Sequence, residues 1–232
     1  MENKKEKTQV YNMVVLDKSG SMNCIRRAAM EGFNETLAGI KKAQKDYADT
    51  QDHYISLVTF CSCSRTAVYD KVPVADAVPL TLEQYEPCCC TPLYDAMGFA
   101  LTSLRSYVKN IDDVAVVVTI ITDGLENASR EYDRKRIHAL VEELKTQGWS
   151  FTFMGANQNS SEVAQSLAIR NSQDFDYSAE GIDRAYKRDR SSKMAFFSKL
   201  NDSYSLRSHM AKKDRIRMNT ELADEAYDET DV

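Results

Sequence analysis

A nearly unbroken run of apolar, mostly β-branched residues, VAVVVTII, occupies residues 114–121. A run of this length and composition is typical of a central strand in a parallel sheet, which is buried on both faces. Parallel strands need crossover connections, and helices packed on the two faces of the sheet usually supply them. The run therefore points to an open α/β fold. It is far shorter than the ~20 apolar residues that cross a bilayer, so we expect no membrane partner.

Patterns elsewhere in the chain supply the remaining elements of such a fold. Strand-like runs are predicted at residues 11–16, 54–60, 66–72, 149–157 and near Phe175, and helical periodicity is predicted for 23–47, 93–110, 137–144, 163–167 and 180–200. Only a few residues separate the second and third strands, which predicts a hairpin, so the third strand runs antiparallel to the second. The expected fold class is α/β with helices on both faces of the sheet.

Length and charge limit the domain organisation and the partners. The chain has 232 residues, and we expect one domain over residues 8–200, a polar extension at 1–7 and a charged, mobile tail at 201–232. The formal net charge is −5 and no long basic run is present, so we expect no nucleic-acid partner. The amino terminus is too polar for a signal peptide, which favours a cytoplasmic protein.

Polar side chains follow the first predicted strand, at the point where the strand ends. The segment DKSGS at residues 17–21 places Asp17, Ser19 and Ser21 at alternate positions, so their side chains can point the same way. Gly20 allows the backbone to tighten between the two serines. In an open α/β sheet, ligands bind outside the carboxyl ends of the strands, so this segment is a candidate binding loop.

Two further oxygen-bearing residues belong to loops that are expected at the same edge of the sheet. Thr91 precedes the second long helix, and Asp123 directly follows the central apolar run. Together with the DKSGS segment they supply two carboxylates and three hydroxyls. An all-oxygen set of this kind suits a hard cation such as Mg²⁺ or Mn²⁺.

These residues resemble the metal-ion-dependent adhesion site (MIDAS) of the von Willebrand factor type A (vWA) family, whose pattern is D-x-S-x-S, a distant Thr and a distant Asp. The matching segments, in order, are DKSGS, TPLYDA and ITDG, and the resemblance covers roughly residues 8–200. It implies a six-stranded, three-layer, Rossmann-like open sheet, mostly parallel, with one antiparallel edge strand. It also implies a bacterial cytoplasmic type of vWA protein and these metal ligands: Asp17, Ser19, Ser21, Thr91 and Asp123.

The resemblance further implies a function. Two carboxylates leave a divalent cation short of one anionic oxygen, and in this family an Asp or Glu of a partner protein supplies it. We therefore expect a metal-dependent protein-binding module rather than an enzyme. An aspartyl-phosphate phosphatase of the haloacid dehalogenase type, with Asp17 as nucleophile, is the alternative. Those enzymes usually carry a second aspartate two residues later as general acid, and here that position is Ser19.

Three consecutive cysteines, Cys88, Cys89 and Cys90, stand where the family most often has small residues such as glycine. Our main interpretation is that they are small buried thiols that pack beneath the metal loop. Two alternatives are a redox-sensitive pair with Cys61 or Cys63 and a soft-metal site, for example for zinc, built from the same cysteines.

The end of the chain is acidic. From Glu221 onward it carries no basic residue but several carboxylates, Glu221, Asp224, Glu225, Asp228, Glu229 and Asp231. The main interpretation is a solvated, solubilising end. The alternative hypothesis is that a tail carboxylate completes the metal site of its own or a neighbouring molecule, which predicts weak self-association.

Overall fold

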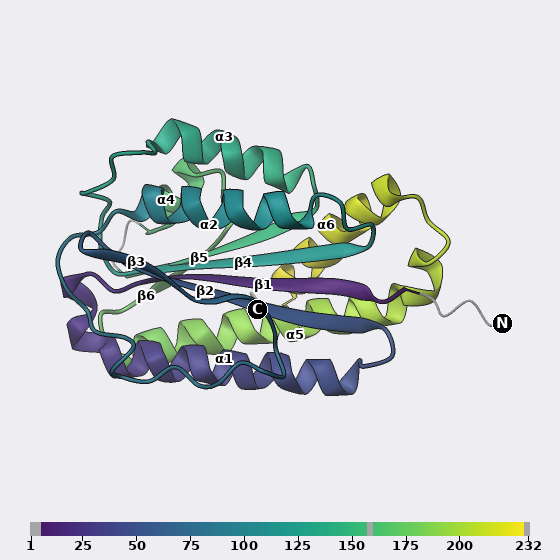
Figure 1. Cartoon of the computed structure of the whole chain (residues 1–232), viewed down its shortest axis with the longest axis horizontal. Helices are drawn as coiled ribbons and strands as arrows, with labels where there is room; N and C mark the ends of the chain where they lie inside the picture. Colours follow the sequence, from purple (N-terminus) through teal and green to yellow (C-terminus); the bar gives the residue numbers. More distant parts are fainter. Residues whose placement is uncertain (1–5, 157–159, 230–232) are drawn as a thin grey trace.

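A six-stranded sheet with helices on both faces forms the centre of the computed structural model, which describes residues 6–156 and 160–229 (Figure 1). The strand order is β3-β2-β1-β4-β5-β6. β3 pairs antiparallel with β2 at one edge, and every other neighbouring pair is parallel. The predicted fold class is thereby confirmed. The strands are β1 (Thr8–Asp17), β2 (Gln51–Cys61), β3 (Ser64–Pro73), β4 (Val114–Thr122), β5 (Trp149–Ala156) and β6 (Asn171–Phe175).

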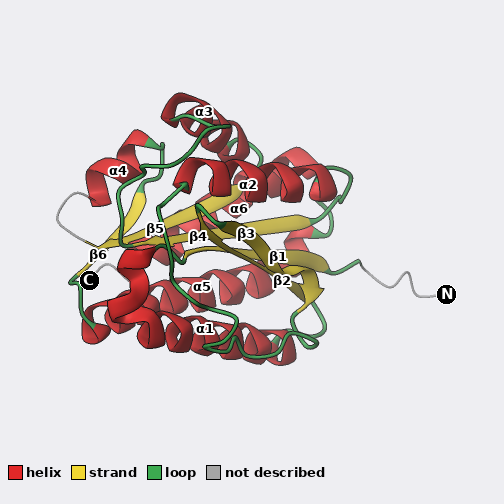
Figure 2. Cartoon of the chain, turned by 60° about the vertical axis from the view of Figure 1, so that its left-hand side comes forward, coloured by secondary structure: helices red, strands yellow, loops and turns green. Residues whose placement is uncertain are grey.

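Helices cover the sheet in two layers (Figure 2). α1 (Arg26–Asp46) and α5 (Ala179–Arg207) pack on one face, and α2 (Leu93–Val108), α3 (Arg134–Lys145) and α4 (Ser160–Ser166) pack on the other. The remaining helical elements are the 3₁₀ turn η1 (Gly20–Ile25) and α6 (Lys212–Asp228). None of the helices in the described residues combines the length and the apolar character that a bilayer-spanning segment needs.

Alternation along β1 explains the two cores. Val10, Val14 and Leu16 belong to the core beneath α1 and α5, whereas Met13 and Val15 belong to the core beneath α2 and α3. Successive side chains of a strand point to opposite faces, so a strand with apolar residues at nearly every position is stable only between two helical layers. This burial fixes the position of the residues that follow β1.

The register of the parallel strands brings the predicted site residues to one edge. Leu16 of β1 pairs with Ile121 of β4, so Asp17 and Thr122 lie side by side where the two strands end. Residues 74–92 form an irregular connection that runs back to this edge, where the buried Tyr85 donates a hydrogen bond of 2.6 Å from its hydroxyl to the carbonyl of Asp17. The connection thereby delivers Thr91 to the ends of β1 and β4.

The expectation of a mobile tail from residue 201 is wrong for the described part of that segment. α5 continues to Arg207, and α6 packs against α5 and β5. Residues on one side of α6 are buried, and they are Asn219, Ala223, Ala226 and Tyr227. Their spacing is helical, but the side chains are mostly small and the residues between them are charged, so the amphipathic pattern is weak.

A buried polar cluster fixes α6 near the amino ends of the strands. The fully buried guanidinium of Arg207 donates to Asp113 Oδ1 at 2.6 Å and to Asn219 Oδ1 at 2.5 Å. Asn219 Nδ2 in turn donates to the carbonyl of Val114 at 2.9 Å. Figure 1 shows α6 (yellow) beginning at the right-hand end of the molecule and running inward, whereas α1 (purple) begins at the left-hand end.

This position contradicts an intramolecular role for the acidic residues of α6 at the metal edge. Glu225 and Glu229 instead form ion pairs with Lys199, at 3.2 and 2.9 Å. Docked in this way, α6 holds its carboxylates away from the ends of β1 and β4. Asp231 lies outside the described residues.

Candidate metal-binding site

The five predicted oxygen ligands lie together at the carboxyl ends of β1 and β4. Ser21 Oγ donates a hydrogen bond of 2.7 Å to Asp123 Oδ1, and the Oγ atoms of Ser19 and Ser21 are 3.1 Å apart. Asp17 ends β1, immediately before this loop. The structure thus brings residues that are more than 100 positions apart in the chain into hydrogen-bonding distance.

Asp17 is fully buried, and hydrogen bonds hold both of its carboxylate oxygens. The backbone amide of Ser19 donates to Oδ1 at 2.6 Å, and the hydroxyl of Thr122 donates to Oδ2 at 2.6 Å. Burial raises the pKa of Asp17 to about 6, although the hydrogen bonds from Thr122 and Ser19 oppose this rise. The carboxylate is therefore oriented by the protein itself, before any cation binds.

Asp123 is buried but only half satisfied. Its Oδ1 accepts the hydrogen bond from Ser21, whereas Oδ2 has no hydrogen-bond partner in the described part of the chain. Burial raises the pKa of Asp123, and the nearby hydroxyls of Ser21 and Tyr177 partly oppose the rise. A buried carboxylate oxygen without a partner costs free energy, and a bound cation would remove that cost. The donor set fits a hard divalent cation.

Thr91 is positioned by Asn127 and by the absence of a side chain at Gly124. Asn127 Oδ1 accepts a hydrogen bond of 2.9 Å from the backbone N–H of Thr91, and the backbone N–H of Asn127 donates to the carbonyl of Thr91 at 3.2 Å. A Cβ added to Gly124 would lie 3.0 Å from Thr91 Oγ1 and 3.5 Å from Ser21 Oγ. Only glycine leaves this space free, and the two hydroxyls border it.

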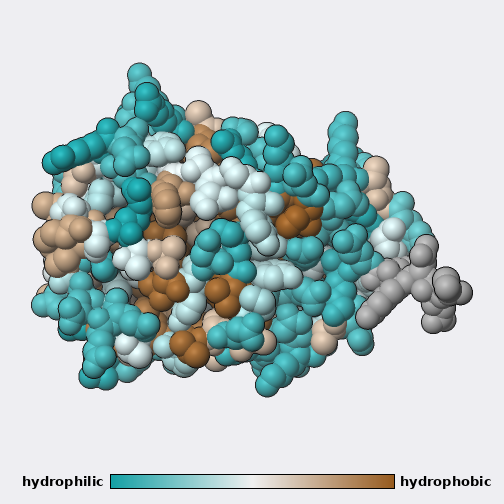
Figure 3. All heavy atoms as spheres, viewed as in Figure 1, coloured by the Kyte–Doolittle hydropathy of each residue, from teal (hydrophilic) through white to brown (hydrophobic). Residues whose placement is uncertain are grey.

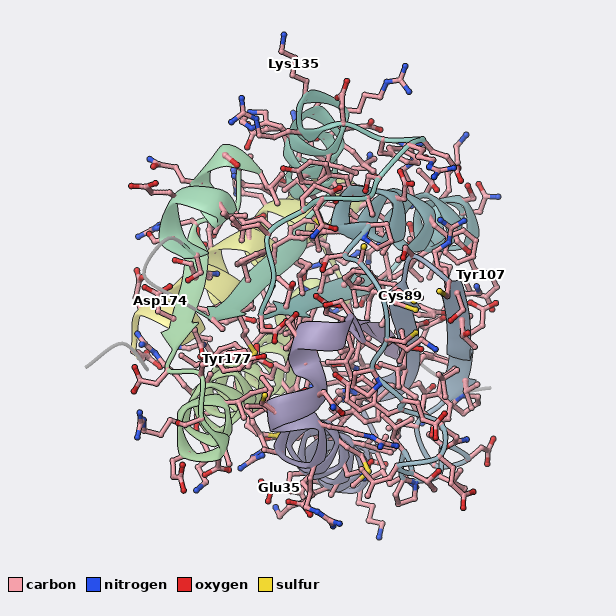
Figure 4. All side chains as sticks on the ribbon, turned by 90° about the vertical axis from the view of Figure 1, so that its left-hand side faces the viewer. Glu35, Cys89, Tyr107, Lys135, Asp174 and Tyr177 are labelled. Atoms are coloured by element: carbon pink, nitrogen blue, oxygen red, sulfur yellow. The ribbon has the colours of Figure 1, made fainter. Side chains whose placement is uncertain are left out.

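Three residues that contribute to the site were not predicted from the sequence: Thr122, Asn127 and Tyr177. The hydroxyl of Tyr177 donates to the backbone carbonyl of Ser21, and burial together with the proximity of Asp123 raises the pKa of Tyr177, so the phenol stays neutral. Figure 4 looks onto this end of the sheet, with Tyr177 and Cys89 on either side of η1. The register of β1 with β4 was the one available signal for Thr122, whereas nothing in the pattern indicated Asn127 or Tyr177.

A cleft of about 900 Å³ opens beside Asp123, lined among others by Gly124, Leu125, Asp174 and Tyr177. Ser21 is exposed, so the site is accessible from outside the molecule. The side chain of Leu125 is 72% exposed at this margin. The arrangement combines a polar, buried floor with an open side, as a site that receives a ligand from another molecule requires.

The main interpretation of the cysteine trio is wrong. Cys89 and Cys90 are exposed and Cys88 is partly exposed, so they do not pack beneath the metal loop as buried thiols. The backbone of this segment is hydrogen-bonded to the metal loop at residues 17–21. Cys88 N donates to the carbonyl of Lys18, and Gly20 N donates to the carbonyl of Cys89. The segment therefore lies beside the loop, at the surface, and not beneath it.

Comparisons with known proteins identify the fold. No family model matches the sequence, and no curated protein is similar to it. Among solved structures, the pilus adhesin SpaC from Lactobacillus rhamnosus GG superposes with a TM-score of 0.60 at 14% identity, covering 83% of this chain and 31% of SpaC. The chain has the vWA fold.

Two further solved structures are similar to the chain. Proximal thread matrix protein 1 from the mussel byssus, solved "with zinc occupied MIDAS motif", gives a TM-score of 0.52 at 16% identity and covers 78% of this chain and 44% of its own. The VWA domain of SpRpn10 gives 0.48 at 12% identity, covering 77% of this chain and 94% of its own. This chain spans about a third of SpaC and less than half of the mussel protein.

Proposed function

We propose that this vWA-fold protein is a divalent-cation-dependent protein-binding module. The proposed metal ligands are Asp17, Ser19, Ser21, Thr91 and Asp123, and the proposed cation is Mg²⁺, with Mn²⁺ as the alternative. The observation that carries the proposal is the buried Oδ2 of Asp123, which has no hydrogen-bond partner in the described residues beside three hydroxyl groups. The zinc-occupied MIDAS of the mussel protein, which has the same fold, supports a cation at this place.

The partner in this proposal contributes an aspartate or glutamate. A divalent cation prefers six or more oxygen ligands, and the five side chains leave at least one position open. The cleft beside Asp123 is the side from which a partner's carboxylate would approach, and the exposed Leu125 and Tyr177 there would offer apolar contact around it. When bound, the cation supplies the positive charge that attracts the carboxylate, while the residues of this chain fix its position.

The face that contains β3 is a weaker candidate for partner binding than the metal edge, because it lacks a large apolar surface to bury. Figure 3 shows that hydrophobic residues there are scattered among hydrophilic ones instead of forming one continuous patch. A surface of this kind is ordinary for a protein without an apolar interface on that side. The metal edge, which combines charge with a few exposed apolar side chains, is the better candidate for recognition.

The proposal includes the absence of catalysis. Both oxygens of Asp17 already accept hydrogen bonds, and the side chain is fully buried, which leaves it poorly placed to attack a phosphoryl group. Ser19 cannot act as the general acid that a haloacid dehalogenase phosphatase needs two residues after its nucleophile. Phosphate release from phosphoesters in Mg²⁺ that depends on Asp17 would refute this part of the proposal.

We retain a bacterial, cytoplasmic setting as part of the proposal. All six cysteines are free, and free thiols suit a reducing compartment.

Calorimetric titration with Mg²⁺ and with Mn²⁺ tests the site. We expect weak binding to the wild type and no binding to the Asp123→Ala and Thr91→Ala variants. Asp174→Ala is the matched control, because Asp174 is an exposed carboxylate on the same cleft but is not a proposed ligand. Equal cation affinity in the wild type and in both ligand variants would refute the assignment.

A capture experiment tests the partner. In Mg²⁺, the wild-type protein should capture one protein reproducibly from a lysate of its native cells. That protein should not be captured when a chelator is present or when the Thr91→Ala variant is used. An acidic residue of that partner should then be found whose change to the amide abolishes binding. A partner retained equally in chelator would contradict metal-dependent recognition.

A further inference from the structure

Four cysteine thiols from two loops converge next to the oxygen site. Cys61 ends β2, Cys63 lies in the turn before β3, and Cys88 and Cys89 lie in the connection before α2. Cys61 Sγ and Cys88 Sγ are 3.0 Å apart. The Sγ atoms of Cys63, Cys88 and Cys89 all lie within 4.8 Å of one another. The cluster is at the surface beside η1, where Figure 4 labels Cys89.

We propose that Cys61, Cys63, Cys88 and Cys89 form a second metal site, which binds one thiophilic cation of the Zn²⁺ type. Thiolates select such cations over Mg²⁺ and Mn²⁺, so this site and the oxygen site take different ions. In a tetrahedral zinc site with metal–sulfur bonds of about 2.3 Å, neighbouring sulfur atoms are about 3.8 Å apart. The Sγ atoms of Cys61 and Cys88 are 3.0 Å apart, and those of Cys63, Cys88 and Cys89 lie within 4.8 Å of one another, so the observed spacings lie on both sides of that value. Cys88 belongs to both groups and links Cys61 to the other two thiols.

The backbone of Cys89 is held in a conformation that cysteine rarely adopts. Its φ is +59°, in the left-handed region that favours glycine. Any residue other than glycine is strained in this region, and such strain concentrates at functional sites. With its backbone in this conformation, Cys89 has its sulfur beside those of Cys63 and Cys88.

Access and chemistry are both sufficient for binding. Cys63 and Cys89 are exposed and Cys88 is partly exposed, so a hydrated cation reaches the sulfur atoms without a conformational opening. Each thiol that binds loses its proton to solvent, and its sulfur lone pair forms the bond to the metal. No electron is transferred, and no further reactant is needed.

Cobalt titration of the reduced full-length protein tests the proposal, with excess Mg²⁺ present to compete for the oxygen site. Co²⁺ bound by thiolates in a tetrahedral site gives near-ultraviolet sulfur-to-cobalt charge-transfer absorption and intense visible bands, whereas cobalt on oxygen ligands gives neither. We expect these bands to saturate at one equivalent of Co²⁺ and to disappear when one equivalent of Zn²⁺ is added.

Matched variants locate the site. Cys63→Ser and Cys89→Ser replace exposed side chains, so they should leave the fold intact and abolish the thiolate bands. Cys90→Ser is the control, because Cys90 is exposed and adjacent but its sulfur is not in the cluster. Asp123→Ala should keep the bands, which separates this site from the oxygen site.

Two results would overturn the proposal. One is the absence of thiolate bands in fully reduced wild-type protein. The other is equal bands in the wild type, Cys63→Ser and Cys89→Ser. A Cys61–Cys88 disulfide, found by mass spectrometry in protein that binds no cobalt when reduced, would assign the same thiols to redox chemistry instead.

Discussion

The hydroxyl of Thr122 donates a hydrogen bond to Oδ2 of Asp17 at 2.6 Å, where β4 ends beside β1. This contact joins the ends of the two strands at which four of the five proposed metal ligands lie, namely Asp17, Ser19, Ser21 and Asp123. Because Oδ1 accepts the amide of Ser19 at the same time, the Asp17 carboxylate has a single orientation. A cation that binds here does not have to order this side chain. Binding therefore loses no conformational entropy at Asp17, and the affinity is higher.

Removal of the Thr122 hydroxyl should therefore weaken cation binding. In Thr122→Val we expect the affinity for Mg²⁺ or Mn²⁺ to fall about tenfold, since one hydrogen bond to a charged group contributes roughly 1.5 kcal/mol. Calorimetric titration measures the change. Thr66→Val makes the same chemical change at an exposed position of β3 and should bind like the wild type. Unchanged affinity in Thr122→Val would show that the hydrogen bond does not position a ligand.

Asp17 should destabilise the metal-free protein at neutral pH. Its pKa is raised to about 6 in the folded state, chiefly by burial, so the folded protein binds the proton more tightly than the unfolded chain does. The free energy of unfolding should then rise as the pH falls from 7 through 6 toward 4, by up to about 3 kcal/mol for this group. Urea unfolding of metal-free protein at several pH values measures this.

The Asp17→Asn variant is the test of that assignment. Without metal at pH 7 it should be more stable than the wild type, and the rise in stability toward low pH should be smaller. With saturating Mg²⁺ the order should reverse, because only the wild type gains stability from binding. A variant that is less stable than the wild type under both conditions would mean that the charge of Asp17 is already compensated.

The site was largely predictable for residues next to strands. Asp17 and Asp123 follow apolar runs, and the carboxyl ends of parallel strands meet at one edge of a sheet, so their proximity follows from the pattern. Tyr177 and Asn127 reach the site through irregular segments, and the path of such a segment depends on tertiary contacts that no periodicity encodes. The cysteine trio misled us because cysteine is commonly buried, whereas here the strand-edge loop leaves Cys89 exposed.

α6 was missed for a different reason. Its buried side is formed largely by alanines and by Asn219, and Asn219 is buried only because Arg207 and the carbonyl of Val114 satisfy its amide group. A sequence pattern counts asparagine as polar and cannot supply partners from elsewhere in the chain. Ala223 and Ala226 add little apolar area each, so the helix lacks the strong stripe that distinguishes α1.

Asn219 should accordingly matter for stability. In Asn219→Ala, Arg207 and the Val114 carbonyl lose a buried partner, so the free energy of unfolding should fall by about 2 kcal/mol or more. Glu225→Ala is the control, since it removes an exposed ion pair with Lys199 worth at most about 1 kcal/mol. Chemical denaturation compares the two. Equal, negligible effects would indicate that the segment after Arg207 is mobile, as the sequence had suggested.

Cation binding at the thiol cluster should strengthen cation binding at the oxygen site. Cys88 N donates to the Lys18 carbonyl at 2.8 Å, and Gly20 N donates to the Cys89 carbonyl at 3.0 Å. A cation held by these thiols restricts Cys88 and Cys89, and through the two hydrogen bonds it restricts the loop that carries Ser19 and Ser21. The first ion to bind already bears the entropy cost of ordering the loop, so the second ion binds more tightly. The coupling between the two sites is therefore positive.

We expect the affinity for Mn²⁺ to increase about fivefold or more when one equivalent of Zn²⁺ is present, as coupling of 1–3 kcal/mol between sites would give. Electron paramagnetic resonance of free Mn²⁺ measures this affinity directly. Cys63→Ser is the matched control, because it removes a thiol but neither backbone hydrogen bond; added Zn²⁺ should not raise its affinity for Mn²⁺. Competition of Zn²⁺ for the oxygen site can only weaken Mn²⁺ binding, so an increase in the wild type that is absent from the variant reports the coupling. Identical Mn²⁺ affinities in wild-type protein with and without zinc at the thiols would show that the two hydrogen bonds transmit nothing.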